Sequence, residues 1–201
     1  MNAPISSLEI SHFPVMLNEV INICSPEKGA SFIDCTFGGG GYSEAILQFS
    51  GTRVIAIDRD KITEKYANAL QERFPKRFNF FKEKFSNIIK IVKKNTKPKA
   101  IIFDLGISSF QLADEKRSFS FNSKNYLNME MGKNKCSAYD VVNNFSKEDL
   151  SEIIKTLGEE KDGKIIANKI DKYRKKKPIE TSNELASIVS NAKKSKRDYK
   201  K

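Results

Sequence analysis

Several residue types are scarce or absent in this chain of 201 residues, and each absence excludes a class of protein. There is no tryptophan, and the single histidine, His12, leaves no material for a histidine-based metal site or a Ser–His–Asp triad. The three cysteines, Cys24, Cys35 and Cys136, have no CxxC spacing, so we expect free thiols in a cytoplasmic protein rather than disulfides or a zinc site. No apolar run reaches the length of a transmembrane helix, and the N-terminus lacks the segments of a signal peptide. We therefore expect no metal and no membrane.

Positive charge is abundant and unevenly distributed. Lys and Arg number 36 against 25 Asp and Glu, a net charge of +11. Residues 151–201 hold 15 basic and 8 acidic residues, and the densest clusters are 174–177 and 193–197. A basic C-terminal quarter indicates a polyanionic partner such as nucleic acid, with a solubilising surface as the alternative.

The first half of the chain alternates between strand-like and helix-like segments. A hydrophobic share of 39% with 14 Phe is enough for a folded core. Four β-prone apolar runs are Ala30–Asp34, Arg53–Asp58, Phe78–Phe81 and Ala100–Leu105. The second and fourth are continuously apolar, which is typical of strands buried on both faces of a parallel sheet. Helices are expected at 14–24, 43–49, 61–74 and 86–94, so the pattern predicts an α/β, doubly wound parallel sheet.

The alternation ends after Leu105. Residues 106–145 are rich in Ser, Asn, Gly and Lys, which predicts a long loop region, and two or three helices follow. Capping signals precede two of them, at Ser146 and in the capping box Thr181–Glu184. We therefore predict two parts, a sheet part over residues 1–109 and a loop-rich, then helical and basic part over 110–201.

A glycine loop follows the first predicted strand and opens a helix. It consists of Gly38, Gly39, Gly40 and Gly41. Successive glycines let the backbone approach a ligand closely, and the following helix N-terminus offers free N–H groups to an anionic group. A flexible turn needs only one or two glycines, so the loop favours ligand binding.

Carboxylates end two of the later strands. Asp58 comes 20 residues after Gly38, where a carboxylate accepts hydrogen bonds from the ribose hydroxyls of an adenosine, unless it serves only as a helix cap. The third glycine of a G-x-G-x-x-G dinucleotide fingerprint is Ser43 here, which favours S-adenosylmethionine over a nicotinamide cofactor. Asp104 ends the fourth run, where it meets the ammonium of the cofactor or a substrate amine, with a cap or turn role as the alternative.

With these motifs the sequence resembles the MraW family of bacterial 16S rRNA cytosine-N4 methyltransferases, which have the Rossmann-like class I S-adenosylmethionine-dependent fold. The matching stretches are His12–Glu19, Asp34–Ser43, Ala56–Asp60, Lys84–Asn87, Phe103–Leu112, Arg117–Phe121, Gly158–Glu160 and Pro178–Leu185. The resemblance implies methylation of a decoding-centre cytidine in the 16S rRNA of the 30S subunit. It implies an S-adenosylmethionine-binding role for residues 1–109 and substrate recognition by residues 110–201, and it leaves the oligomeric state open.

The resemblance also implies site residues. Cofactor contacts are expected at Gly40, Gly41, Tyr42, Asp58, Phe85, Asp104 and Gln111, in addition to Gly38 and Gly39 of the loop. For catalysis we expect Asp104 to polarise the exocyclic amine of cytosine, with Ser108 and Ser109 as partners for the base edge.

Three departures from the family pattern accompany the resemblance. Tyr42 stands where the family usually has His, and Leu127–Gly132 lacks an acidic residue and reverses a charge. The family also has further C-terminal strands that complete the sheet, so here the sheet is expected to be incomplete, with an uncovered apolar edge. A catalytically inactive, truncated RNA- or S-adenosylmethionine-binding fragment is therefore the alternative function, and a nicotinamide-dependent oxidoreductase is a more distant one.

Overall fold

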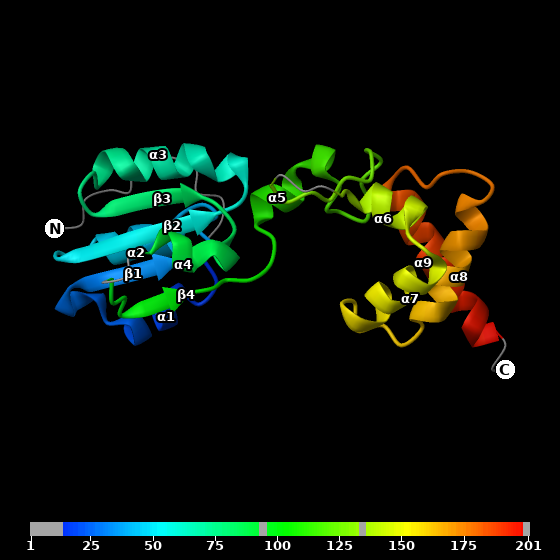
Figure 1. Ribbon diagram of the computed structural model, residues 1–201, viewed down its shortest axis with the longest axis horizontal. Helices are drawn as coiled ribbons and strands as arrows, with labels where there is room; N and C mark the ends of the chain where they lie inside the picture. Colours follow the sequence, from blue (N-terminus) through cyan, green and yellow to red (C-terminus); the bar gives the residue numbers. More distant parts are fainter. Residues whose placement is uncertain (1–13, 93–95, 133–135, 199–201) are drawn as a thin grey trace. The chain divides into compact units, whose positions relative to one another are not determined.

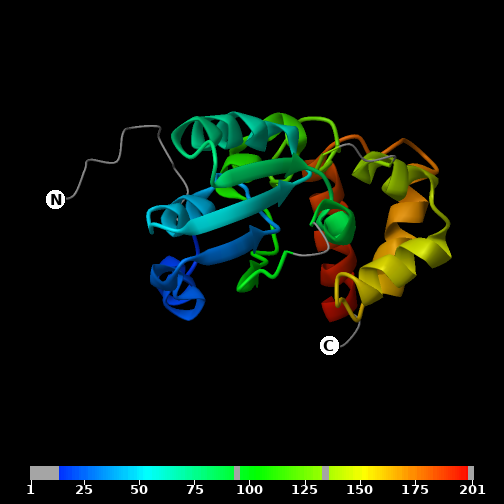
Figure 2. The same ribbon diagram turned by 60° about the vertical axis from the view of Figure 1, so that its left-hand side comes forward.

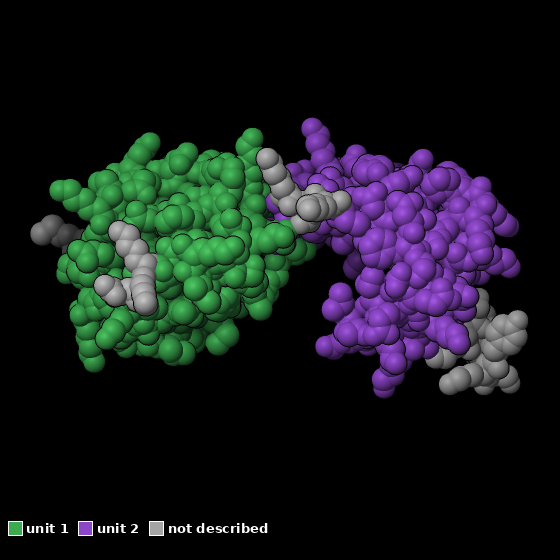
Figure 3. All heavy atoms as spheres, in the orientation of Figure 1, with its two compact units in different colours: residues 1–109 green, residues 110–201 purple. Residues whose placement is uncertain are grey.

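The computed structural model describes residues 14–92, 96–132 and 136–198, with side chains up to residue 193 in the last range. It divides into two compact units, residues 1–109 and 110–201, coloured separately in Figure 3. His12 and the start of the matching stretch 12–19 lie outside the described residues, as do residues 93–94 at the end of the expected helix 86–94 and the side chains of 194–197 in the second basic cluster.

The first unit is built on a parallel sheet of four strands in the order β3-β2-β1-β4, which run in one direction in Figure 1. The strands are β1 (Ala30–Asp34), β2 (Thr52–Asp58), β3 (Phe78–Lys82) and β4 (Ala100–Ile102). Asp34 pairs with Ala56 of β2 and with Ile102 of β4, so the carboxyl ends of these strands meet at one edge. The predicted α/β parallel class is confirmed.

The two faces of the sheet are covered by different helices. The helices of this unit are α1 (Leu17–Cys24), α2 (Gly41–Leu47), α3 (Glu64–Arg73) and α4 (Ile88–Ile91), with short 3-10 turns at Pro26–Lys28, Lys61–Thr63 and Phe85–Asn87. Helices α1, α2 and α3 pack on the face that carries Phe32, Val54 and Phe78. Helix α4 packs on the opposite face, over Ile33 and Ile57. The sheet therefore lies in the middle of a three-layer unit.

Strand β4 differs from the prediction made from its apolar sequence. All four predicted strands form, but β4 ends at Ile102, and Ile101 and Phe103 are 46% and 48% exposed. The expectation of burial on both faces is confirmed for the central part of β2 and is wrong for β4. Ile101 lies beside Ile33 on the face that α4 covers, but the α4 side chains pack over β1 and β2 and not over β4. Within the described ranges β4 is also an edge strand that pairs only with β1.

The helix boundaries follow local backbone geometry. Helix α1 begins at Leu17 rather than at Pro14, because Met16 has a left-handed φ of 53° and interrupts the helical path. Helix α4 is shorter than expected because the chain turns to an extended conformation at Val92.

The second unit is helical. It contains α5 (Ser109–Ala113, which starts at the unit boundary), a 3-10 turn at Glu115–Arg117, α6 (Ala138–Asn144), α7 (Lys147–Thr156), α8 (Gly163–Arg174) and α9 (Ser182–Asp198). Figures 1 and 2 both show α6–α9, in yellow to red, packed against one another. Their core includes Leu127, Leu150, Ile166 and Ile179. None of the helices in the described ranges combines the length and apolarity needed to cross a bilayer.

The loop and cap predictions for this unit are partly wrong. Residues 106–145 contain α5 and α6 in addition to loops, and Ser137 caps α6 in a capping box that the preceding polar stretch concealed. Ser146 caps α7 as expected. At α9 the Glu184 N–H bonds the Thr181 hydroxyl, but the Glu184 carboxylate accepts from the Glu180 N–H, so the reciprocal bond of the box is displaced by one residue.

Arg77 connects helix α2 to the sheet just before β3. Its guanidinium donates to the carbonyl groups of Leu47 and Phe49, each at 2.9 Å, and to the hydroxyl of Thr52 at 3.2 Å. The two carbonyl groups lie at the end of α2, where helical partners run out. The guanidinium groups of Arg77 and Arg73 both lie near the Phe74 ring. Arg73 forms an ion pair with Glu44, and this pair is exposed.

We predict that Arg77→Gln lowers the free energy of unfolding by about 2 kcal/mol, because several charge-assisted hydrogen bonds are lost and partly buried acceptors are left unsatisfied. Arg73→Gln is the matched control and should cost less than about 1 kcal/mol, as expected for an exposed ion pair. Urea unfolding measures both values. Equal losses for the two variants would contradict the role assigned to Arg77.

Candidate functional site

The junction between β1 and α2 is held by a buried carboxylate. Asp34 ends β1 and is fully buried. Its oxygens accept hydrogen bonds from the Ser43 hydroxyl at 2.7 Å and from the Thr36 N–H at 3.2 Å. Because Ser43 lies in the first turn of α2, this carboxylate ties the end of the strand to the start of the helix and sets the path of the glycine loop between them.

At two positions of the loop, steric contacts explain why the residue is glycine. Gly40 has a φ of 86°, and a Cβ there would lie 2.8 Å from the Phe37 ring. A Cβ on Gly41 would lie 2.1 Å from Cγ of Pro14, so only glycine lets the segment before α1 pack against the start of α2. The loop is therefore shaped by packing on its inner side as well as being open to close approach.

Asp58 closes the loop from the neighbouring strand. One carboxylate oxygen accepts the Gly38 N–H at 2.8 Å, and the other accepts the Asp60 N–H at 2.8 Å. A backbone hydrogen bond from Arg59 is a third contact to this carboxylate. Since a carboxylate has about four lone-pair sites, about one acceptor site is left. Asp58, expected as a ribose acceptor from its spacing of 20 residues after Gly38, is in direct contact with the glycine loop.

Asp104 lies beyond the end of β4, next to the same loop. Its N–H donates to the Thr36 hydroxyl at 2.7 Å, and its exposed side chain lies 3.4 Å from the Tyr42 hydroxyl. The Tyr42 hydroxyl lies closer to the Val15 carbonyl, at 2.5 Å, and its one proton therefore serves mainly that bond. Tyr42 is only 6% exposed, and its hydroxyl thus holds the segment before α1 beside Asp104.

An aromatic pair lies beside these carboxylates. Phe85, just after β3, meets Phe103 edge-to-face with ring centroids 5.5 Å apart. Phe85 is 41% exposed, so part of its ring is available to a ligand. Phe85 is therefore not a buried core residue.

Crowded carboxylates and burial shift the acidity of the site. Burial, with smaller contributions from the Asp58 and Asp104 charges, raises the pKa of Asp34 to about 6. The hydrogen bonds from Ser43 and Thr36 act in the opposite direction and lower it. Burial also raises the pKa of Asp58. Burial and the nearby Asp104 raise the pKa of Tyr42 to about 12, so its hydroxyl stays protonated and a donor.

The structure brings Gly38, Tyr42, Asp58 and Asp104 together at the carboxyl edge of the sheet, with Phe85 beside Phe103. Ser108 is half-buried and Ser109 exposed, a few residues beyond Asp104. Gln111 is buried and belongs to the second unit. The binding and catalytic roles of all these residues, and of Gly39, Gly40 and Gly41, stay predictions. In the described part of the chain, no group of three or more His, Cys, Asp or Glu side chains is arranged to hold a metal ion.

Asp34 and Thr36 were missed as organising residues. Both stand in the stretch 34–43, but their polar side chains carry no periodic signal of their own. The available clue was Ser43, a hydroxyl in the first helical turn nine residues after a strand-end aspartate.

A parallel sheet with a glycine loop after its first strand, clasped by a carboxylate from the second, defines a Rossmann-like fold of the class I methyltransferase type. Residues 9–201 match the MraW methylase family, and the chain belongs to that family.

Curated relatives carry the name ribosomal RNA small subunit methyltransferase H. The protein from Ehrlichia canis is 42% identical over 181 residues, covering 89% of this chain and 61% of the relative. The Orientia tsutsugamushi protein is 40% identical, covering 90% and 58%, and the Campylobacter jejuni protein is 38% identical, covering 96% and 63%. The chain thus spans about 60% of the length of these relatives.

We predict a pH signature for Asp34. Its pKa is about 6 in the folded chain and about 3.9 when unfolded, so its contribution to stability is present below about pH 4 and is lost as the pH rises through 6. Relative to Asp34→Asn, which cannot ionise, the native chain should lose up to about 3 kcal/mol of unfolding free energy between about pH 4 and pH 7. Urea unfolding over that range measures the difference.

Asp140→Asn is the control of opposite sign. Hydrogen bonds from the Ser137 N–H and hydroxyl hold the pKa of Asp140 below its usual value, so there the native chain gains relative to the variant as the pH rises. A difference between native and Asp34→Asn that does not change with pH would contradict the assignment.

Proposed function

We propose that the chain carries the cofactor- and substrate-binding parts of an S-adenosylmethionine-dependent methyltransferase that modifies the exocyclic N4 of a decoding-centre cytidine in 16S rRNA of the 30S subunit, in the cytoplasm. The observation that carries the proposal is the contact between Gly38 and Asp58, with Asp104 at the same sheet edge, in a chain of the MraW methylase family. The names of the curated relatives support ribosomal RNA as the substrate class.

The residues present fit S-adenosylmethionine. The Asp58 carboxylate keeps acceptor capacity for a ribose hydroxyl, and the exposed part of the Phe85 ring offers a face for adenine. The loop backbone from Gly38 to Gly41 is proposed to bind the amino acid end of the cofactor, and Gln111 is proposed as a further contact. When bound, S-adenosylmethionine supplies a methyl group on a positively charged sulfur.

Methyl transfer to cytosine depends mainly on how the amine is positioned against the methyl group. The cytosine amine is a poor nucleophile, since its lone pair is delocalised into the ring, and it must lose a proton as the N–C bond forms and the C–S bond breaks. We assign to Asp104 the role of accepting a hydrogen bond from this amine, and then its proton, because its carboxylate is exposed while its backbone is held by Thr36. Ser108 and Ser109 are proposed as partners for the base edge.

The second unit, residues 110–201, is proposed as the substrate-recognition part. It holds the basic cluster 174–177. In this assignment the first unit binds the cofactor and carries Asp104, and the second binds RNA.

We predict that Asp58→Asn weakens S-adenosylmethionine binding at least tenfold, because an amide offers one acceptor where the carboxylate offers two and loses the charge. Isothermal titration calorimetry measures the dissociation constant. Glu72→Gln, an exposed carboxylate on α3, is the matched control and should bind as the native chain does. Failure of the native chain to bind S-adenosylmethionine would refute the cofactor assignment.

For Asp104 we predict that Asp104→Asn lowers methyl incorporation into 30S subunits by about 100-fold or more, with S-adenosylmethionine affinity nearly unchanged, because general-base contributions are of that order. Radiolabelled methyl transfer and calorimetry provide the two readouts. A loss of cofactor affinity instead would assign Asp104 to the cofactor ammonium. Cofactor binding by the native chain without any methyl transfer would favour the alternative of a non-catalytic binding fragment.

A further inference from the structure

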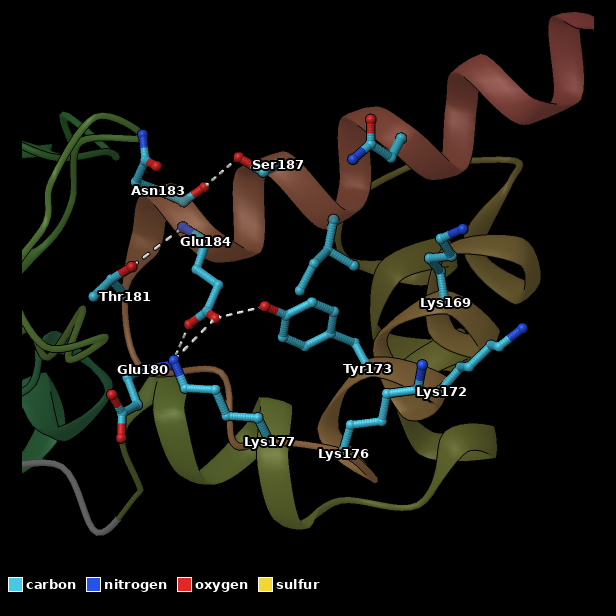
Figure 4. Close-up of a pocket in the computed structure, with 12 residues that line it drawn as sticks. Lys169, Lys172, Tyr173, Lys176, Lys177, Glu180, Thr181, Asn183, Glu184 and Ser187 are labelled. Atoms are coloured by element: carbon cyan, nitrogen blue, oxygen red, sulfur yellow. Dashed lines mark hydrogen bonds and ion pairs between the residues drawn. The ribbon is translucent and has the colours of Figure 1, made fainter.

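A basic groove lies within the second unit, between α8 and the start of α9. Its volume is about 620 Å³. Four lysines, Lys169, Lys172, Lys176 and Lys177, line it together with the ring of Tyr173, and polar residues of α9 face them (Figure 4). The groove belongs to a single unit and is separate from the sheet edge that carries Asp58 and Asp104.

The acidic residues of the groove do not cancel its charge. Glu184 accepts the Tyr173 hydroxyl at 2.8 Å and the Glu180 N–H at 3.0 Å, and it pairs with Lys177 at 3.7 Å. Burial opposes ionisation of Glu184, but these bonds outweigh it and hold its pKa below the usual value. Glu180 is exposed near Thr181, away from the row of lysines on α8.

The structure separates the lysines with ion-pair partners from those without. In the cluster 174–177, Arg174 and Lys175 pair with Asp171 and Lys177 pairs with Glu184. Arg174 also donates to the Val142 carbonyl, so it serves the fold. For Lys169, Lys172 and Lys176 no ion pair is found among the described residues, and all three are exposed.

These three lysines form a row. Their spacing of three and then four residues places them on one side of α8 and of the turn that continues it, where the Lys176 N–H bonds the Tyr173 carbonyl. The backbone positions of successive lysines are thus about one helical turn, about 5 Å, apart, and their flexible side chains can follow the successive phosphates of one nucleic acid strand.

We propose that the α8–α9 groove holds a single-stranded segment of RNA, with Lys169, Lys172 and Lys176 at its phosphates and the Tyr173 ring against a base. Resting on the proposed function, which makes RNA the substrate, this inference names where the strand is held. Single-stranded RNA suits the groove because it presents phosphates, a flat base and 2′-hydroxyls together. An acidic peptide would use the lysines but has no group for the ring.

The test compares two triple variants of equal charge in the full chain. The groove triple is Lys169→Gln, Lys172→Gln and Lys176→Gln. The control triple is Lys155→Gln, Lys161→Gln and Lys164→Gln, whose exposed lysines lie on or near α7 and α8 but do not line the groove. Gln has nearly the helix propensity of Lys, and circular dichroism checks that both variants fold.

Fluorescence anisotropy with a labelled short oligocytidylate, without cofactor, measures RNA affinity. We expect the groove triple to weaken binding about 100-fold at about 0.1 M salt and to reduce the slope of log K against log[salt] by about 2, because each phosphate contact to a single strand contributes about 0.7. The control triple should stay within about threefold of the native chain. Equal losses of RNA affinity in both triple variants would overturn the groove as the RNA-binding site, because the effect would then follow from net charge alone.

The Tyr173 ring has its own variants. Tyr173→Leu should weaken oligocytidylate binding about tenfold through lost stacking, whereas Tyr173→Phe keeps the ring and should bind nearly as the native chain does. An equal loss in both variants would assign the effect to the hydroxyl bond with Glu184 and remove the base from the proposal.

Three other anionic ligands test whether the groove prefers an RNA strand to a single nucleotide, a membrane surface or an acidic peptide. Cytidine monophosphate, vesicles of phosphatidylcholine with phosphatidylserine, and an oligoglutamate peptide should each bind far more weakly than oligocytidylate. Groove-dependent binding of any of these at equal strength would overturn the RNA strand as occupant.

Calorimetry with S-adenosylmethionine on the groove triple separates this proposal from the proposed function. Unchanged cofactor affinity with lost RNA binding supports the groove. If the native chain binds RNA through the groove but does not bind S-adenosylmethionine, the groove stands and the methyltransferase proposal fails. If cofactor binding is intact and neither triple affects RNA binding, the groove fails alone.

Discussion

A carboxylate that water does not reach organises the first unit. Asp34 is fully buried at the end of β1 and holds both the Thr36 N–H and the Ser43 hydroxyl, so the strand, the loop and the helix that follows meet at one point. Burying a carboxyl group is costly unless it is hydrogen-bonded, which is why its partners come from both sides of the loop. The position of the glycine loop, and with it the contact between Gly38 and Asp58, depends on this junction.

The segment after β1 is held on both sides. The Cys35 N–H bonds the Ile102 carbonyl of β4, and the Phe37 N–H bonds the Ile57 carbonyl of β2, so the loop leaves the sheet from between its two neighbours. Thr36 completes the arrangement by accepting the Asp104 N–H. Groups from three strands thereby converge at one edge of the sheet. Among the described residues, no three His, Cys, Asp or Glu side chains are arranged to hold a metal ion. Ligands of parallel α/β sheets generally bind at this edge.

The two units carry different kinds of exposed groups. The first offers backbone N–H groups, carboxylates and an exposed Phe85 ring, which suits a small cofactor. The second offers lysines spaced along a helix, which suits an extended anion. Ion pairing decides which lysines are available, because Asp171 and Glu184 occupy three of the four basic side chains in the cluster 174–177. Counting charge along the sequence could not make that distinction, since it depends on which acidic side chains the fold places nearby.

The elements that could be predicted are those with a strong local signal. The four apolar runs correctly indicated the strands of the sheet, and the glycine loop and Asp58 were found from their order in the chain, although the hydrogen bond between them was not predicted. Helix α6 was missed because its capping box lies inside a polar stretch. The exposure of β4 was missed because an apolar run does not reveal its place in the sheet.

The sequence by itself determined the class of fold, the family and the candidate residues at the strand ends, because hydrophobic period, glycine clustering and residue order are local properties. Only the tertiary structure decided that Asp34 organises the junction, that Tyr42 holds the Val15 carbonyl beside Asp104, and that Phe85 is partly exposed against Phe103. It also decided that three lysines line a groove without ion-pair partners among the described residues. These features depend on burial and on contacts between segments distant in the chain, which arise only when the strands and helices pack.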